Sequence, residues 1–163
     1  MNKVKKKVAI TQSLDVATGV KHPSVFPWDF EDKSINEINC TGVFEFIPAK
    51  LRGKFMDEIF RILTPDGRMA LTVPYFTSWI AIHDFRIEWP PLSEQSFLLF
   101  NKEWRGVNKK DLNLKCDFDY TYGYTAEAEV AARNDETRSM QIKYYNNTVQ
   151  SLHLMFTKRP PKQ

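Results

Sequence analysis

The sequence is poor in cysteine and glycine, with two and six of these residues respectively in a chain of 163. Cys40 and Cys116 are too few for a disulfide scaffold and are not spaced as metal ligands, so we expect a reducing compartment and no metal site. The scarcity of glycine leaves few places where the backbone can closely approach a ligand. The longest apolar runs, residues 79–82 and 97–100, are far shorter than the ~20 residues that cross a bilayer, and the N-terminus lacks the apolar stretch of a secretory signal. We therefore expect a cytoplasmic protein without a membrane partner.

The charge is nearly balanced, since the chain has 23 basic and 20 acidic residues and a net charge of +3. Apolar residues make up 42% and charged residues 26%, which is ordinary for a globular chain and excludes a disordered or coiled-coil protein. We expect a single domain over residues 1–163, with a basic segment at 1–12 and a basic tail at 158–163. Basic ends without an interleaved aromatic array are typical of solvated tails, so nucleic acid is not an expected partner.

The clearest predicted element is a helix that begins near Pro48, a residue suited to a first turn. Apolar residues recur at every fourth position along it: Leu51, Phe55, Ile59 and Leu63. The Pro-Asp-Gly sequence at 65–67 is predicted to end this helix, and the apolar run at 68–74 is predicted to be a buried strand. A helix, a tight turn and a buried strand form the second half of an α/β unit.

Short strands are also predicted at residues 8–10, 14–17, 35–40, 117–122 and 148–157. Ser93 suits the start of a short helix that ends at Phe100, and residues 126–145 are compatible with a longer one. Alternation in the last strand places His153 on its outward face. The order of elements predicts an α/β fold whose sheet is mostly parallel with an antiparallel late strand, and with helices on both faces.

Several motifs stand in a familiar order between residues 26 and 74. Residues 26–38, with the sequence FPWDFEDKSINEI, resemble the segment that leads into the fourth strand of class I S-adenosylmethionine-dependent methyltransferases. Residues 42–48 and 55–68 are similar to the two motifs that follow in that family, and residues 73–75 to the end of its fifth strand. The resemblance extends over residues 15–157 and implies an incomplete class I methyltransferase, or Rossmann-like, sheet.

Phage-type members of the family resemble the chain most in the segment after the fifth strand. The matching positions are Thr77, Ser78, Asp84, Trp89, Pro90, Pro91, Glu94, Phe97, Phe100, Asn101, Lys102 and Trp104. The resemblance implies that the protein transfers a methyl group from S-adenosylmethionine to an acceptor that the sequence does not identify. A phage-encoded protein would act in the cytoplasm of a bacterial host.

The family's glycine-rich first motif has one superficial counterpart, the sequence LDVATG at residues 14–19. The short interval between Asp15 and Ile38 leaves no room for the helix and two strands that follow a first motif in the family. We therefore interpret residues 14–16 as the second strand, whose terminal acid in the family accepts hydrogen bonds from the cofactor ribose hydroxyls. The first strand and helix would then be missing, or replaced by the basic segment at residues 3–12.

The resemblance implies that Asp15, Phe30, Cys40, Thr41 and Gly42 bind the cofactor. Each of three has a structural alternative: Asp15 would be a solvated acid, Cys40 a small buried apolar residue and Gly42 a tight turn.

Candidate substrate residues are Glu45, Tyr75, His83 and Asp84. They lie at or near the carboxyl ends of two central strands, the edge where open α/β sheets bind ligands. The sequence assigns no catalytic residue.

A second function remains open, because several polar positions of the family motifs are lost here. A sheet without its central first strand exposes an edge and apolar surface, which favours pairing with a second copy or another partner. The alternative function is therefore a non-catalytic binding or scaffold protein that forms a homo-oligomer through the remnant sheet.

Overall fold

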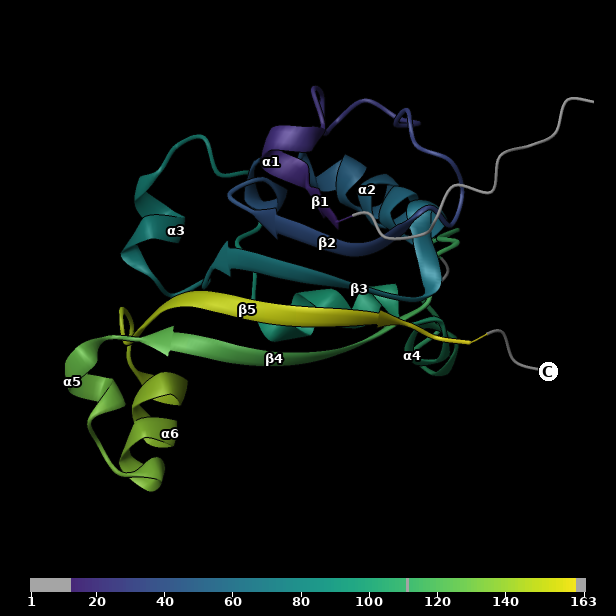
Figure 1. The fold of residues 1–163 in the computed structure, drawn as a ribbon. Helices are drawn as coiled ribbons and strands as arrows, with labels where there is room; N and C mark the ends of the chain where they lie inside the picture. The colour runs from purple at the N-terminus through teal and green to yellow at the C-terminus, as the bar shows by residue number, and fades with distance from the viewer. Residues whose placement is uncertain (1–12, 111, 161–163) are drawn as a thin grey trace, which may run out of the picture.

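The computed structural model describes residues 13–110 and 112–160, which form one five-stranded sheet with surrounding helices (Figure 1). The strands are β1 (Ser13–Asp15), β2 (Ile35–Thr41), β3 (Leu63–Pro74), β4 (Phe118–Ala126) and β5 (Val149–Lys158). Their order in the sheet is β1-β2-β3-β5-β4. β1, β2 and β3 are parallel, and β5 is antiparallel to both β3 and β4. The predicted class, a mostly parallel α/β sheet with an antiparallel late strand, is confirmed. The strand predicted at residues 8–10 lies outside the described residues.

The helical elements fill the connections between these strands. They are α1 (Val16–Gly19), η1 (Phe44–Phe46), α2 (Ala49–Ile62), α3 (Trp79–His83), η2 (Glu94–Phe100), α4 (Lys102–Val107), α5 (Ala128–Ala131) and α6 (Asp135–Tyr144). The prediction of a short helix from Ser93 to Phe100 corresponds to η2, which Ser93 and Ser96 cap reciprocally. No helix among the described residues is long and apolar enough to cross a membrane.

The helix α2 starts after Pro48 as predicted but ends earlier than the sequence indicated. It stops at Ile62, and the chain passes directly into β3, so residues 65–67 lie inside the strand. Gly67 is required there because a Cβ atom would lie 2.8 Å from Leu63 Cδ2 and 3.1 Å from the carbonyl oxygen of Asn36. The close approach coincides with an irregular register between β2 and β3. The Pro-Asp-Gly sequence therefore shapes a strand and does not end the helix.

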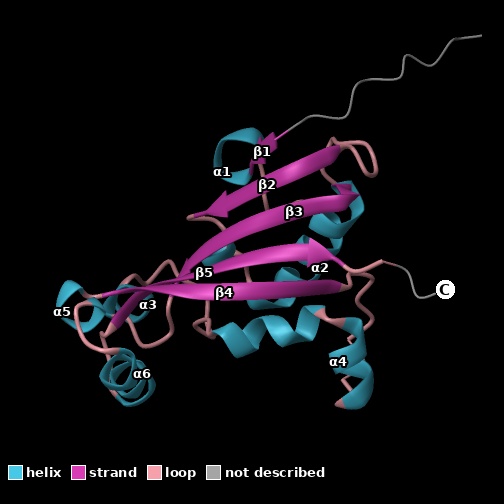
Figure 2. Ribbon diagram, turned by 60° about the horizontal axis from the view of Figure 1, so that its bottom comes forward, coloured by secondary structure: helices cyan, strands magenta, loops and turns pink. Residues whose placement is uncertain are grey.

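The core lies on one face of the sheet, beneath α2 and η2. Phe55 of α2 packs against Phe44 with ring centroids 5.3 Å apart, and Phe97 of η2 packs against Phe156 of β5 at 5.7 Å. Ile38 of β2 belongs to the same buried cluster. Figure 2 shows α2 behind the strands. Burial of these rings fixes which face of each strand is apolar.

The opposite face of the sheet carries mainly polar side chains, and no described helix of the α2 and η2 layer packs on it; we call it the open face. Exposed or half-exposed residues on it are Glu37, Asn39, Thr41, Arg68, Ala70, Thr72, His153, Met155 and Thr157. Strict alternation with the buried residues places them there. Helices therefore surround the sheet unevenly, because the described helices α2 and η2 pack on one face only. His153 faces outward, as predicted, and its ring nitrogens contact Thr72 Oγ1 and Thr125 Oγ1 at 3.0 and 2.6 Å.

The position of β1 corrects the interpretation of residues 14–16 as a second strand. Leu14 pairs with Ile38, so β1 lies directly beside β2, the strand whose sequence resembles the family's fourth. In doubly wound sheets of this kind the first strand lies beside the fourth. β1 therefore occupies the place of a first strand. The spacing argument failed because the chain returns through residues 16–34 to the neighbouring strand, with no intervening strand among the described residues.

Candidate functional site

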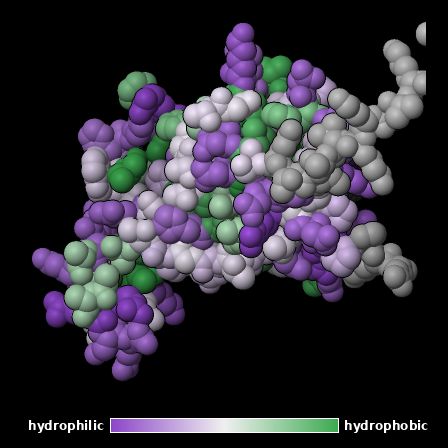
Figure 3. Space-filling view, in the orientation of Figure 1, coloured by the Kyte–Doolittle hydropathy of each residue, from purple (hydrophilic) through white to green (hydrophobic). Residues whose placement is uncertain are grey.

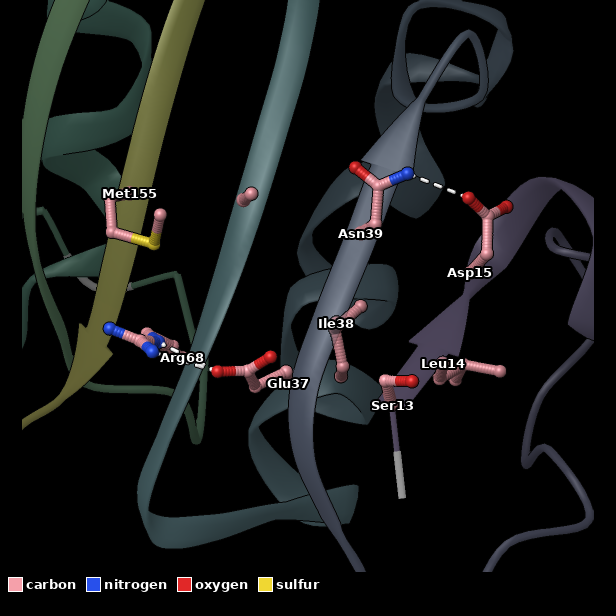
Figure 4. A pocket seen from close by; sticks show the side chains of 9 residues that line it. Ser13, Leu14, Asp15, Glu37, Ile38, Asn39, Arg68 and Met155 are labelled. Carbon is pink, nitrogen blue, oxygen red and sulfur yellow. Dashed lines mark hydrogen bonds and ion pairs between the residues drawn. The ribbon is translucent and has the colours of Figure 1, made fainter. Parts of the chain in front are cut away.

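The carboxyl ends of β1 and β2 are joined by a contact between Asp15 and Asn39 (Figure 4). These two residues are paired across the strands, and Asn39 Nδ2 donates a hydrogen bond of 2.6 Å to Asp15 Oδ2. This bond is the main cause that lowers the pKa of the Asp15 carboxyl below its usual value. Thr41 Oγ1 donates to Asn39 Oδ1 at 3.3 Å and so orients the amide. Asp15 is therefore ionised at neutral pH and fixed in position.

The turn after β1 is closed by the same carboxylate. The backbone N–H groups of Ala17 and Thr18 donate to Asp15 Oδ1 at 3.0 and 3.3 Å, so Asp15 is the N-cap of α1. Gly19 does not open this turn to a ligand, because a Cβ atom there would lie 2.5 Å from Leu14 Cδ1. The N–H groups that a glycine-rich turn offers to a bound anion are thus satisfied within the chain.

The other expected cofactor residues occupy different surroundings. Thr41 is exposed, and Gly42 follows it with φ +69°; a Cβ atom at Gly42 would have no contact within 4 Å, so this turn is open to solvent. Cys40 is fully buried on the α2 face, and burial raises the pKa of its thiol to about 12. Phe30 is half-buried against the core, with its carbonyl oxygen accepting from Arg61 Nη1 at 2.7 Å. Of the five expected residues, Asp15, Thr41 and Gly42 present side chains or open backbone at this edge.

Glu45 lies in η1, just beyond the end of β2, and is buried with 5% of its surface exposed. Burial raises the pKa of its carboxyl. Its Oε2 atom has no hydrogen-bond partner among the described residues. A buried carboxyl oxygen without a hydrogen-bond donor destabilises the folded protein, so a ligand that donates a hydrogen bond to Oε2 would bind favourably here.

A neighbouring arginine holds the loop that is hydrogen-bonded to the backbone of Glu45. Arg52 is buried and donates to the carbonyl oxygens of Glu88 and Pro90 at 2.7 and 2.8 Å, and to that of Ile47 at 3.2 Å. Glu88 N in turn donates to the backbone oxygen of Glu45 at 2.9 Å. Arg52 was not predicted as a site residue, because it stands on the charged side of the predicted helix and nothing in the periodicity shows that it is buried.

The three other candidate substrate residues differ in burial: Tyr75 is buried, whereas His83 and Asp84 are accessible. Tyr75 follows β3, is buried beside Tyr124 with ring centroids 5.2 Å apart, and burial raises its pKa to about 12. His83 is exposed at the end of α3. Asp84 accepts from Arg86 Nη2 at 2.6 Å, and Arg86 lowers the pKa of this carboxyl to about 2. Hydrophobic atoms gather at α3 in Figure 3, where Ile82 is 72% exposed.

A hollow of about 370 Å³ adjoins Asp15 on the open face of the sheet (Figure 4). The side chains that line it include Asp15, Glu37, Asn39, Arg68, Ala70 and Met155, from β1, β2, β3 and β5. We call it the sheet hollow. Sequence reasoning did not find it, although the alternation of polar and apolar residues along β2 was a usable sign of a polar face. No group of three or more possible metal ligands occurs within residues 13–110 and 112–160.

The residues present fit part of S-adenosylmethionine. The ionised Asp15 suits ribose hydroxyls or an ammonium group, and the open turn at Gly42 admits close approach. The turn after β1 offers no free N–H groups to the methionine carboxylate, because Asp15 already accepts from them. In addition, β1, β2 and β3 follow one another in order, so these three strands lack the reversal that opens the crevice of a doubly wound sheet. Cofactor binding here would depend on side chains more than on backbone.

Comparisons with known proteins identify the fold. No family model matches the chain, and no curated protein matches it. Among solved structures, a SAM-dependent methyltransferase from Archaeoglobus fulgidus is similar with a TM-score of 0.53 and 10% identity, over 79% of this chain and 62% of that one. Geranyl diphosphate C-methyltransferase from Streptomyces coelicolor A3(2), solved with Mg²⁺, geranyl diphosphate and S-adenosyl-L-homocysteine, has a TM-score of 0.50 and 11% identity, over 85% and 52%.

The chain thus spans less than two thirds of the length of either structure. It shares the fold of S-adenosylmethionine-dependent methyltransferases, as the motifs at residues 26–74 indicated.

Proposed function

We propose that this protein binds S-adenosylmethionine at the carboxyl ends of β1 and β2 and transfers its methyl group to an acceptor bound at the same edge. The observation that carries the proposal is the Asp15–Asn39 pair, an oriented and ionised carboxylate at the junction of β1 and β2. Ligands of open α/β sheets bind at this edge. The cofactor, when bound, supplies an electrophilic methyl group on a sulfonium.

Different residues along this edge would bind the cofactor and accept the proton. Asp15 would accept from the cofactor, and the open turn at Thr41 and Gly42 would let the ligand approach the backbone. The unpaired Oε2 of Glu45 would accept a proton from the O–H or N–H group that receives the methyl, and the burial that raises the pKa of this carboxyl makes it a stronger base. These roles favour an acceptor with an O–H or N–H group. A phage-encoded protein of this kind would act in the cytoplasm of its bacterial host.

Calorimetric titration tests the proposal. Wild-type protein should bind S-adenosylmethionine and S-adenosylhomocysteine with a micromolar dissociation constant. The Asp15→Ala substitution should raise this dissociation constant about tenfold. Asp66→Ala, which removes an exposed acid in β3, is the matched control and should bind as the wild type does. Absence of binding to either ligand would overturn the proposal.

A non-catalytic binding protein is the second candidate, and the closed turn after β1 favours it. Asp15 satisfies the N–H groups of Ala17 and Thr18 itself, so the fold would persist without its cofactor. β1 is an edge strand, and edge strands pair readily with another chain. This candidate expects a homo-oligomer by light scattering and no methyl transfer; a strictly monomeric protein would contradict it.

A further inference from the structure

The nucleoside half of the cofactor needs a surface beside Asp15, and β1 is the last strand of the described sheet on that side. In a complete doubly wound sheet the nucleotide lies across the crevice between two halves of the sheet. Here β1 is an edge strand, and among the described residues no strand continues the sheet past it. On the other side of Asp15, over β2 and β3, the sheet hollow adjoins the same carboxylate.

The sheet hollow could hold the ribose and the base. It begins at Asp15 and Asn39, crosses Ala70 on β3 and ends at Met155 on β5. Its volume of about 370 Å³ lies within the range of small-molecule sites. We propose that the ribose and base of an adenosyl ligand bind in the sheet hollow, on the open face of the sheet; this inference rests on the proposed function and names where its cofactor lies.

Two carboxylates line the hollow and can accept hydrogen bonds from an adenosyl ligand at separate points, Asp15 from the ribose hydroxyls and Glu37 from another donor. Asp15 Oδ2 accepts a hydrogen bond from Asn39, and a carboxylate oxygen can accept two. Glu37 pairs with Arg68, but both Arg68 Nε and Nη2 donate to Glu37 Oε1, at 3.2 and 2.8 Å, so Oε2 can accept from a ligand. Ser13 pairs with Glu37 and Asp15 with Asn39, and Figure 4 shows Glu37 directed towards Arg68, on the opposite side of Asn39 from Asp15.

The floor of the hollow suits a flat aromatic base. Ala70 stands between Asn39 and Met155 in one row across the sheet, and its small side chain leaves space above β3. Met155 is 39% exposed on an otherwise polar face, and a thioether makes favourable contacts with aromatic rings. The Arg68 side chain is 60% exposed at the rim, and a guanidinium stacks on aromatic planes. The base would thus lie on Ala70, between Met155 and Arg68.

The sequence of β2 shows that this face differs from the core face. Parallel strands normally carry apolar residues on both faces because helices cover both. Glu37, Asn39 and Thr41 alternate instead with Ile38 and Cys40, which face the core. These side chains are exposed and bond to one another, as Asn39 does to Asp15 and Glu37 to Arg68. Among the described residues, this face therefore presents polar groups to a ligand.

The test is a set of calorimetric titrations with S-adenosylmethionine and with adenosine, using variants that fill the hollow. Ala70→Phe occupies its floor and should weaken both ligands at least about tenfold. Thr121→Phe adds the same ring to the open face on β4, where Thr121 pairs with Met155 but does not line the hollow, and should leave binding unchanged. Glu37→Gln, which keeps the shape of the side chain, should weaken both ligands severalfold.

The outcomes separate this inference from the proposed function. Loss of both ligands in Ala70→Phe, with Thr121→Phe unaffected and the circular dichroism spectrum unchanged, supports the inference. Binding of S-adenosylmethionine that Ala70→Phe and Glu37→Gln leave unchanged overturns the inference and leaves the proposed function standing. Binding of adenosine in the hollow without binding of S-adenosylmethionine supports the nucleoside site and overturns the proposed function. Binding of neither ligand to the wild type overturns both.

Discussion

The Asn39 side-chain amide donates a hydrogen bond of 2.6 Å to the carboxylate of Asp15, and this bond ties the end of β1 to β2. β1 has three residues and a single neighbour among the described strands, so this contact adds a polar anchor to a short strand. The same carboxylate caps α1. One residue therefore holds the first strand, the first helix and the edge where we place the ligand.

Replacement of Asn39 by Ala should raise the pKa of Asp15 towards its ordinary value, because the amide is the largest cause of the shift. A carboxyl whose pKa is lowered in the folded state stabilises the protein above its unfolded pKa, and this contribution is lost as the pH falls through the folded pKa. The variant should thus be less stable than the wild type at neutral pH, and the difference should vanish in acid. A carboxyl NMR titration measures the pKa, with Thr125→Ala as control. An unchanged midpoint for Asp15 would contradict the assignment.

Arg52→Leu should lower the free energy of unfolding by about 3 kcal/mol, because three carbonyl oxygens lose a charged donor. Lys54→Leu alters an exposed position on the same helix and should change stability by less than about 0.5 kcal/mol. Urea unfolding measures both variants. Equal effects of the two substitutions would show that Arg52 does not hold the loop at Glu88 and Pro90.

Two adjacent residues of β5 test whether one face of the sheet is open. Met155→Lys places a charge on the polar face and should change the free energy of unfolding by less than about 1 kcal/mol. Leu154→Lys places it in the core, where Leu154 is 3% exposed, and should prevent folding. Circular dichroism melting curves distinguish these outcomes. A severe effect of Met155→Lys would mean that the face is covered.

The two cysteines should react slowly with a thiol reagent in the native protein. Burial raises the pKa of Cys40 to about 12 and raises the pKa of Cys116 further, so thiolate is scarce at neutral pH. Both side chains are also buried. Labelling followed by absorbance should be complete only after denaturation. Rapid labelling of one thiol in the native protein would indicate that its surroundings open.

The sequence predicted the elements whose apolar pattern is strong. The four-residue spacing in α2 and the alternation in β5 follow directly from packing on one face, and both elements were found where expected. The end of α2 was misplaced, because Gly67 was interpreted as a turn residue although its role is to allow β3 to approach the backbone of Asn36. Propensity alone does not separate these two uses of glycine.

The site was less predictable, because it depends on which strands become neighbours. Asp15 was a candidate from its motif, but its partner Asn39 follows only from the pairing of β1 with β2. The burial of Glu45 and Arg52 likewise depends on the loop at Glu88, which is distant in sequence. Local patterns carry no information on such contacts.

The most direct test of the account is an amide chemical-shift titration of the folded protein with S-adenosylhomocysteine. We predict saturable shifts at Asp15, Asn39 and Ala70, which mark the edge and the sheet hollow, and none at Val130 in α5. An absence of shifts at Asp15 and Asn39 at saturating ligand would contradict the claim that this sheet edge binds an adenosyl cofactor.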